Sequence, residues 1–432
     1  MPSLAALLPL ALVPAAALSA PVKPAHAAPA PIRIATRAPP AGALTRDQFL
    51  ERQVDSFARL ARGAKRGASI APGLHKRGKT ATVPLKLHYN EYQGLDSHAA
   101  EIKIGGQSLP VLFDTGSPDL VVPVDCESGC SNGFFKTSKS KTFVKDGRDV
   151  SVSYGTGAAT GYVAEDTVQV AGLTVEKQVF AAATKLDTAG GENWSGIFGL
   201  SPGGGAYTGG PSFIQRLIQD GALASNEFSL SLGGSKPELV LGGVDSSRIQ
   251  ADLVTVPNLG AASGIWLAGI GATTVDNNVV DEAVSYALVD SGSSFNAIPR
   301  SAAAAIYAKV NGTLWQTQRM TISGIQADVD IYTVPCSPSP DSGRVGFSFV
   351  GASSPTPVSM SSKTNVLEYA DEESKERCFA ATYGADVEMI PGSGMSGALL
   401  GMPFLKSVLT VFSFDNAANG VSMAFSGVKT GK

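Results

Sequence analysis

A six-residue motif that occurs twice constrains the fold of this 432-residue chain more than any other feature. The stretch LFDTGS at Leu112–Ser117 returns as LVDSGS at Leu288–Ser293. Each copy ends an apolar run and is followed further along by a second apolar segment with a glycine, at Gly196–Leu200 and at Ala398–Met402. Because the two halves share this order, we expect two similar lobes that each bring one aspartate to a shared cleft.

Short apolar runs separated by Gly, Asn, Asp and Ser fill the chain from about Thr82 onward, as strands and tight turns do. Examples are Thr82–Leu87, Glu101–Ile104, Val150–Tyr154 and Leu239–Leu241. Helices are few and short. They are expected at Ser212–Asp220, where Ser212 can act as the N-cap, and at Ser301–Val310. The sequence therefore predicts an all-β protein, and its length suits two lobes plus leader segments.

The positions of the histidines argue against several classes of hydrolase mechanism. His26, His75, His88 and His98 are the only four, and all lie before residue 99. Ser-His-Asp and Cys-His mechanisms need an imidazole beside the nucleophile, and zinc hydrolases normally use two or three histidine ligands. The β-rich part contains none after residue 98, so carboxylates remain as the reactive groups unless His88 or His98 reaches the site. We expect no metal and no organic cofactor.

Asp114 and Asp290 are the predicted catalytic pair. Glycines 116 and 292 let backbone N–H groups approach the carboxylates, and the neighbouring hydroxyls can donate hydrogen bonds to them. Two facing carboxyls share one proton, because adjacent like charges cannot both ionise cheaply. The ionised member can then take a proton from water while the other polarises a carbonyl. One such motif alone is more often an Asx turn after a strand; its repetition argues against that alternative.

From about residue 82 to its end the chain resembles the pepsin family of aspartic endopeptidases. The resemblance rests on both aspartate motifs, on VSYGTG at Val152–Gly157, on ELVLGGVD at Glu238–Asp245 and on LGMPFL at Leu400–Leu405. It implies a bilobal pepsin-like aspartic protease fold with pseudo-twofold symmetry. It also implies extended polypeptide substrates in the cleft and inhibition by pepstatin-type compounds. The likeness leans toward the secreted fungal type.

The same resemblance assigns further site residues. Tyr154 is the expected flap tyrosine, and Val152–Gly157 is the hairpin that covers the cleft. Substrate-binding roles fall to Gly116, Tyr154, Gly155, Thr156, Gly292 and Ser293, and supporting roles to Thr115, Ser117 and Ser291. The chain departs from the family at Val121, where a tryptophan usually supports the flap tyrosine, at Ser293, where threonine is more usual, and at Met402, where aspartate is usual.

The first 27 residues read as a secretory signal peptide, with cleavage after residue 20 as one option. Leu4–Leu18 is rich in Leu and Ala and carries no charge. The alternative is a buried N-terminal helix, which Pro9, Pro14 and Pro21 disfavour. We therefore expect a secreted protein, with an acidic vacuolar compartment as the alternative.

Residues 28–81 are expected to form a basic propeptide, and Thr45–Arg62 in it has helical spacing of apolar residues. Residues 1–90 hold 13 Lys and Arg and 3 Asp and Glu, whereas the rest of the chain holds 21 and 34. A basic leader and an acidic body attract each other; the alternative is a disordered tail that binds nothing. The family resemblance implies that the propeptide inhibits its own enzyme, with Lys79 or Lys86 covering the aspartates.

Lobe boundaries, disulfides and glycosylation complete the expected organisation. The lobes are 82–257, with Asp114 and the flap, and 258–432, with Asp290. Three disulfide pairings are possible, and Cys126–Cys130 with Cys336–Cys378 keeps each bridge within one lobe. A zinc site is the alternative, but no histidine lies near these cysteines. The sequon at Asn311 is expected to be glycosylated.

The sequence thus predicts an aspartic endopeptidase that is made as a zymogen and hydrolyses peptide bonds at acidic pH. We expect a monomer that binds neither nucleic acid nor membrane. A catalytically inactive pepsin-like binding protein is the first alternative, and the missing tryptophan at Val121 is its support. A glycosidase with two carboxylates is the second, but its acid and base would not normally lie in two copies of one motif.

Overall fold

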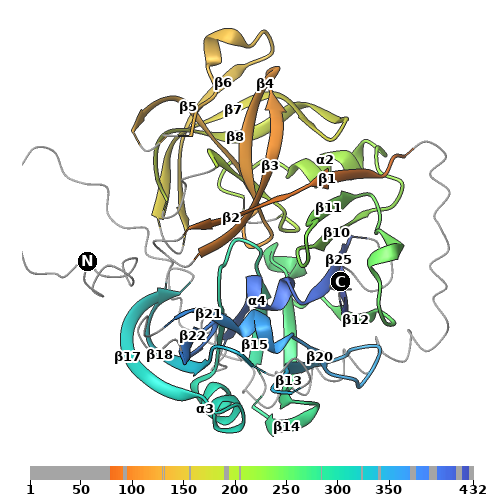
Figure 1. Cartoon of the computed structure of the whole chain (residues 1–432). Helices are drawn as coiled ribbons and strands as arrows, with labels where there is room; N and C mark the ends of the chain where they lie inside the picture. The colour runs from red at the N-terminus through yellow and green to blue at the C-terminus, as the bar shows by residue number, and fades with distance from the viewer. Residues whose placement is uncertain are drawn as a thin grey trace, which may run out of the picture.

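A computed structural model describes most of the chain from Gly78 onward. It describes residues 78–90, 95–128, 130, 132–154, 157–188, 194–203, 206–283, 285–322, 325–338, 342–369, 376–388, 397–414 and 421–427. The expected signal peptide and the expected helix at Thr45–Arg62 lie outside these residues. The described part forms two lobes, one above the other in Figure 1, and most of its regular structure is strand.

The upper lobe is built on an eight-stranded sheet. Its strands are β2 (Lys86–Asn90), β3 (Leu95–Ile104), β4 (Gln107–Asp114), β5 (Leu120–Ser128), β6 (Val144–Tyr154), β7 (Gly157–Val170), β8 (Leu173–Thr188) and β9 (Gly196–Gly199). They pair in the order β2-β3-β4-β9-β5-β8-β7-β6, and β3 also pairs with β7. The expected flap hairpin is therefore the turn between β6 and β7, where Tyr154 pairs with Gly157.

The lower lobe is built on a twelve-stranded sheet. Its strands are β13 (Leu267–Val275), β14 (Asn278–Asp281), β15 (Ser285–Val289), β16 (Asn296–Ile298), β17 (Thr313–Ile322), β18 (Ile325–Pro335), β19 (Val345–Phe349), β20 (Val358–Ser359), β21 (Val366–Tyr369), β22 (Arg377–Ala380), β23 (Thr382–Ala385) and β24 (Gly397–Leu400). The long β17–β18 hairpin curves along one side of this lobe (Figure 1).

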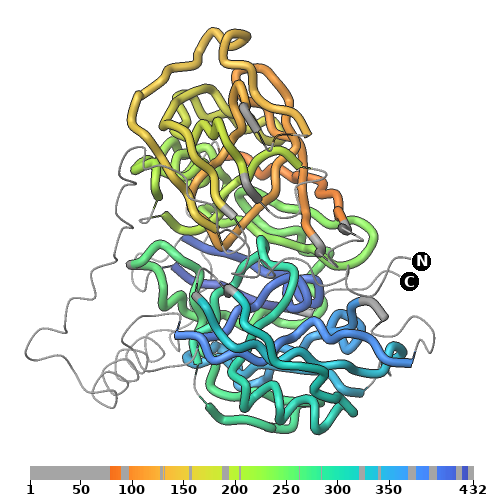
Figure 2. Tube along the Cα trace, turned by 90° about the vertical axis from the view of Figure 1, so that its left-hand side faces the viewer, coloured from red at the N-terminus to blue at the C-terminus, as the bar shows by residue number. Residues whose placement is uncertain are grey.

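A six-stranded sheet joins the two lobes. Its strands are β1 (Ala81–Pro84), β10 (Glu227–Ser231), β11 (Glu238–Leu241), β12 (Val254–Pro257), β25 (Val408–Ser413) and β26 (Ser422–Gly427), in the order β1-β11-β10-β25-β26-β12. Figure 2 shows the last two strands, in dark blue, at the junction between the lobes. The end of β12 coincides with the predicted lobe boundary at residue 257, yet β25 and β26 return across it.

The helices are short, as expected. They are α2 (Phe213–Gln219), α3 (Arg300–Lys309) and α4 (Met402–Leu405), with 3₁₀ turns η2 (Thr137–Lys139), η3 (Ser246–Arg248), η4 (Ala261–Ser263) and η5 (Ser362–Asn365). Ser212 caps α2 through its side chain, and Gln215 completes a capping box. Within the described part of the chain, no helix is long and apolar enough to cross a membrane.

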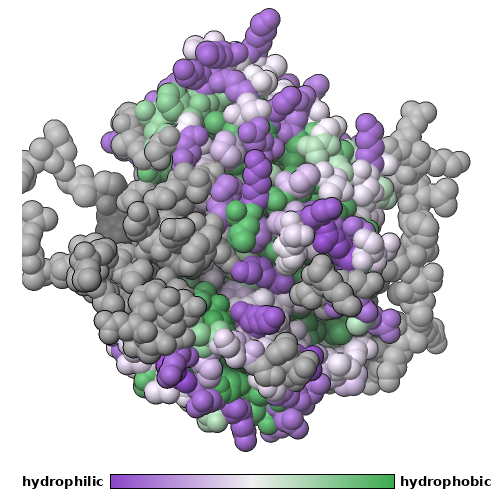
Figure 3. All heavy atoms as spheres, in the orientation of Figure 1, coloured by the Kyte–Doolittle hydropathy of each residue, from purple (hydrophilic) through white to green (hydrophobic). Residues whose placement is uncertain are grey.

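One apolar core runs through both lobes and the sheet that joins them. At the junction, Phe228 stacks on Phe412 with ring centroids 4.7 Å apart, and Trp266 donates its indole N–H to the Leu200 carbonyl at 3.0 Å. The junction is therefore packed like a domain interior. On the outer face, by contrast, polar side chains cover much of the surface in Figure 3, and apolar ones show in smaller patches.

Both predicted disulfides are confirmed. Cys126 and Cys130 are bonded within the upper lobe, with Cα atoms 6.3 Å apart. Cys336 and Cys378 are bonded within the lower lobe, with Cα atoms 4.9 Å apart, and link the end of β18 to β22. Among the described residues, no cluster of three or more His, Cys, Asp or Glu side chains is placed to hold a metal ion.

Candidate active site

The two copies of the repeated motif form the same local structure. Asp114 ends β4, which runs parallel to β9, and Asp290 follows β15, which runs parallel to β24. The Leu200 N–H donates to the Asp114 carbonyl at 2.7 Å, and the Asp290 N–H donates to the Leu400 carbonyl at 3.0 Å. The apolar glycine segments noticed in the sequence are thus the parallel neighbours that fix each aspartate turn.

Crossed hydrogen bonds between Thr115 and Ser291 tie the two turns together. The Thr115 N–H donates to Ser291 Oγ at 2.9 Å, and the Ser291 N–H donates to Thr115 Oγ1 at 2.9 Å. Each hydroxyl then donates into the other lobe, Thr115 to the Val289 carbonyl at 2.9 Å and Ser291 to the Phe113 carbonyl at 2.8 Å. All four bonds are buried, so they hold the lobes in fixed register at the base of the two turns.

The carboxyl groups of Asp114 and Asp290 meet above this crossing. A Cβ atom added to Gly116 would lie 2.5 Å from Asp290 Oδ1, and one added to Gly292 would lie 2.5 Å from Asp114 Oδ1. Each carboxyl therefore occupies the space over the other turn's glycine, which no residue with a side chain would leave open. The Gly116 and Gly292 N–H groups donate to Oδ1 of Asp114 and Asp290, both at 2.8 Å.

Burial and the negative charge of Asp114 raise the pKa of Asp290 well above its usual value. A side-chain hydrogen bond with Asp114 acts in the same direction, whereas the N–H groups of Gly292 and Gly116 oppose it. The Ser117 hydroxyl donates to Asp114 Oδ2 at 2.5 Å. Asp290 therefore gives up its proton less readily than an ordinary aspartate does.

Ser293 differs from its counterpart Ser117. Its hydroxyl donates to the Phe295 carbonyl at 3.1 Å and not to the Asp290 carboxyl. Its carbonyl accepts from the Met402 N–H at 2.8 Å, and the Met402 side chain is buried. The structure thus places Ser293 beside the pair, while its hydroxyl is engaged within the lower lobe.

Tyr154 lies at the end of β6 with its hydroxyl buried. Burial raises the pKa of Tyr154 well above its usual value, and the charges of Asp114 and Asp119 and the nearby Tyr207 act in the same direction. The influence of Asp114 places this tyrosine within electrostatic reach of the pair. Gly155 and Thr156 lie outside the described residues.

Asp119 is a further residue of this site, and no sequence pattern had indicated it. This buried carboxylate accepts hydrogen bonds from the N–H groups of Tyr207 at 2.8 Å and Thr208 at 3.2 Å, and from Thr208 Oγ1 at 2.6 Å. It holds the segment around Tyr207 next to the first aspartate turn. Its place two residues after Ser117 could have marked it, but an aspartate in a turn is ordinarily exposed.

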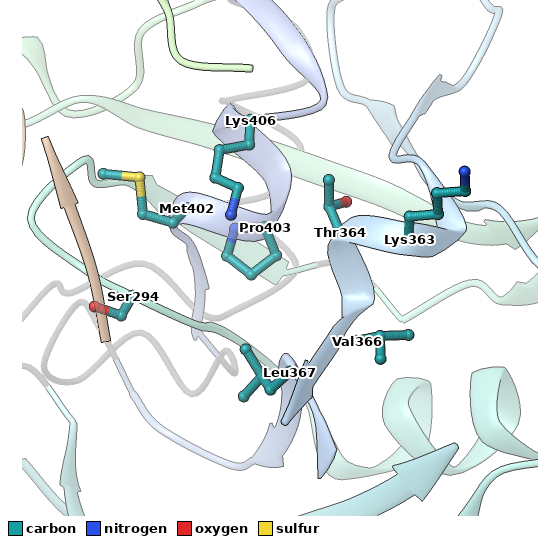
Figure 4. A pocket seen from close by; sticks show the side chains of 8 residues that line it. All are labelled: Ser294, Lys363, Thr364, Val366, Leu367, Met402, Pro403 and Lys406. Atoms are coloured by element: carbon teal, nitrogen blue, oxygen red, sulfur yellow. The ribbon is translucent and has the colours of Figure 1, made fainter. Parts of the chain in front are cut away.

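A cavity of about 320 Å³ lies beside the Asp290 turn. Ser294 and Met402 line it on the side of that turn, and Leu367 and Pro403 line it elsewhere. In Figure 4 the Lys406 side chain extends toward Pro403, whereas Lys363 points away. Neither aspartate lines this cavity, so it adjoins the pair without containing it.

Lys79 and Lys86, the residues expected to cover the aspartates, lie in strand regions of the described fold. Lys79 forms a bridge with Leu223, and Lys86 pairs with Ala99 in the β2–β3 ladder. Both are exposed. Within the described residues, neither forms an ion pair with a carboxylate.

Comparison with known proteins agrees with this geometry. The eukaryotic aspartyl protease family model matches residues 97–425. An aspartic protease of Phaffia rhodozyma is 32% identical over 324 residues, which are 74% of this chain and 74% of that protein. Pepsin A of Sus scrofa is 30% identical over 330 residues, 74% of this chain and 78% of that protein. Cathepsin D of Dictyostelium discoideum is 27% identical over 367 residues, 80% and 87% of the two chains. The chain belongs to the eukaryotic aspartyl protease family and is a pepsin-like aspartic-type endopeptidase.

Proposed function

We propose that the chain is made as a secreted zymogen and that its mature form cleaves peptide bonds in acid with Asp114 and Asp290 as the catalytic residues. The observation that carries this proposal is the meeting of the two carboxyls above the Thr115–Ser291 crossing, where each carboxyl occupies the space over the other turn's glycine. Such a pair retains one proton at acidic pH, which is the state that the reaction needs.

In the proposed reaction, a water held between the two carboxyls is the nucleophile. Ionised Asp114 takes a proton from the water, and the water oxygen forms a bond to the peptide carbonyl carbon. Asp290 gives its proton to the carbonyl oxygen, so the intermediate is a neutral gem-diol. The C–N bond then breaks as the amine receives the proton held by Asp114 and Asp290 regains one from the diol. No covalent intermediate with the enzyme forms.

Pepsin-like proteases act on polypeptides, and an extended peptide suits the cleft between the lobes. Such a peptide binds by main-chain hydrogen bonds and by alternate side chains in pockets. The proposed contacts with the peptide are backbone groups of Gly116 and Gly292 and the hairpin at Tyr154–Thr156. The Ser293 hydroxyl donates to the Phe295 carbonyl, so the proposed role of Ser293 depends on its place beside the aspartate pair and not on its hydroxyl.

The basic leader is the proposed inhibitor of the zymogen. The charge contrast between residues 1–90 and the remainder supports an electrostatic contact. In acid, carboxylates of the body become protonated and this attraction weakens, so the leader is released at the pH at which the enzyme works. Because Lys79 and Lys86 are exposed in strand regions, basic residues before Gly78 are the better candidates for the covering group.

Asn311 is the proposed glycosylation site. It is exposed, has a positive φ of 55°, and begins the sequon Asn311-Gly312-Thr313 just before β17. A bulky glycan there would extend into solvent without displacing core residues. Use of this site is consistent with the proposed secretory route, since glycosylation of this kind accompanies secretion.

Replacing either aspartate tests the proposed function. Asp114→Asn and Asp290→Asn should each lower kcat/KM by more than about a thousandfold, because neither variant can both accept and donate the proton. The measurement is digestion of haemoglobin or casein at acidic pH after removal of the leader, with and without pepstatin. Asp328→Asn, at an exposed ion pair with Arg319, is the control and should retain activity. No cleavage by the unaltered mature chain at any acidic pH would instead identify an inactive binding protein.

A further inference from the structure

A separate apolar cluster lies around Tyr154 in the upper lobe. Its buried members are Ala99, Leu112, Val121, Val150, Val152, Ala159, Val163, Ala181, Ala183, Leu186, Trp194 and Ile197, and Cys130, Tyr154 and Val179 pack against them. We call this set the flap cluster. Apart from the disulfide-bonded Cys130, only Trp194 and Tyr154 in it carry polar side-chain atoms.

Those two polar atoms are both buried and both without a hydrogen-bond partner. Neither the Trp194 indole nitrogen nor the Tyr154 hydroxyl forms a hydrogen bond in the structure. Buried polar groups in proteins are nearly always paired, with protein or with bound water. The chemistry of the two is complementary, because an indole N–H only donates and a tyrosine hydroxyl both accepts and donates.

Trp194 is held firmly by its neighbours. Its carbonyl accepts from Asn132 Nδ2 at 3.1 Å, and the Ser195 hydroxyl donates to the Asn132 carbonyl at 2.7 Å. The Ser195 N–H donates to the Pro110 carbonyl at 2.7 Å. The side chain of Trp194 is only 6% exposed. The backbone beside Trp194 is therefore held by hydrogen bonds, and burial confines its indole within the cluster.

Val121, another member of the flap cluster, cannot provide such a hydrogen-bond donor. It is fully buried in the flap cluster and pairs with Ile197 of β9, the strand that begins two residues after Trp194. Its side chain offers no hydrogen-bonding group to Tyr154. Among the described members of the cluster, Trp194 is therefore the one that can supply an N–H from its side chain.

We propose that the indole N–H of Trp194 holds the Tyr154 hydroxyl through one bound water and so acts as a positioning residue for the peptide-binding cleft. A water satisfies both atoms at once, and buried waters of this kind are ordinary parts of protein structure. The inference rests on the proposed function of the cleft. Because Tyr154 lies within electrostatic reach of Asp114, its orientation affects how a peptide is held against the aspartate pair.

A double-mutant cycle tests the coupling. Trp194→Phe and Tyr154→Phe should each lower kcat/KM about tenfold, mainly through KM, because both remove the same hydrogen-bonded unit. The double variant should then also lose about tenfold, whereas independent effects would multiply to about a hundredfold. Trp315→Phe, an exposed tryptophan packed on Phe379, is the matched control and should leave kcat/KM unchanged. Losses that multiply in the double variant would overturn the proposal.

A second measurement does not depend on activity. The chain has three tryptophans, so a ¹⁵N-labelled sample gives three indole signals, from Trp194, Trp266 and Trp315. Tyr154→Phe should shift the Trp194 signal and leave that of Trp266, which is bonded to Leu200, in place. An unmoved Trp194 signal would contradict the proposal even in an active enzyme. A shifted signal in a chain that cleaves no peptide would support the hydrogen bond and reject the proposed function instead.

Discussion

At the scale of single residues, the two aspartates of this protein are chemically unequal although their turns are alike. Ser117 donates to Asp114, whereas the corresponding Ser293 is directed to Phe295. The sequence predicted both carboxyls and both hydroxyls, because the motif is local and repeats. It could not predict this difference, since the direction of a hydroxyl depends on carbonyls that tertiary packing brings near.

The raised pKa of Asp290 predicts how stability changes with pH. Its folded-state pKa lies above the usual 3.8, so folding binds a proton and the stabilisation is present at low pH. That stabilisation is lost as pH rises from about 4 through the folded-state pKa. The free energy of unfolding of Asp290→Asn should therefore fall less than that of the unaltered chain across this range, because asparagine stays neutral. Urea unfolding from acid to neutral pH measures the difference. Parallel curves for the two proteins would contradict the prediction.

At the scale of elements, the crossing of Thr115 and Ser291 fixes the two turns against each other. Both residues were predicted to have supporting roles from the resemblance to the pepsin family. The pairing between them joins positions 176 residues apart, which no local pattern reveals. By contrast, α2 and its Ser212 cap follow from local sequence alone and were predicted nearly to the residue.

Thr115→Val tests this crossing. The variant keeps the side-chain shape but leaves the Ser291 N–H and the Val289 carbonyl without their partner. We expect the free energy of unfolding to fall by about 2 kcal/mol, the usual cost of such buried unpaired groups. Urea unfolding measures it, and Thr174→Val on the exposed face of β8 is the control. An equal effect of both substitutions would show that the crossing contributes nothing particular.

At the scale of the whole molecule, the two lobes share the six-stranded sheet. The motif repeat predicted two lobes, and the proposed boundary after residue 257 falls at the end of β12, which belongs to this shared sheet. The sequence analysis did not reveal that β25 pairs with β10 and that β26 pairs with β12. Such long-range pairings depend on which edges remain open once each lobe has formed, and short apolar runs do not encode a unique partner.

The shared sheet predicts that the upper lobe does not fold alone. Without residues 258–432, β10 loses β25, β12 loses β26, and Phe228 loses the ring of Phe412. A chain of residues 78–257 should show no cooperative thermal unfolding, whereas co-expression with residues 258–432 should restore it. Circular dichroism melting measures both. A cooperative transition in residues 78–257 alone would show that the lobe is an independent domain.

The unequal hydroxyls beside the two aspartates also make the proposed catalytic centre asymmetric. A centre with perfect twofold symmetry would treat a polypeptide threaded forwards or backwards alike. In the proposed reaction, one aspartate delivers a proton and the other withdraws one, so the scissile amide must present its oxygen to a fixed side. The proposed site would therefore favour one amino-to-carboxyl direction of the bound peptide, and the different orientations of Ser117 and Ser293 contribute to that preference.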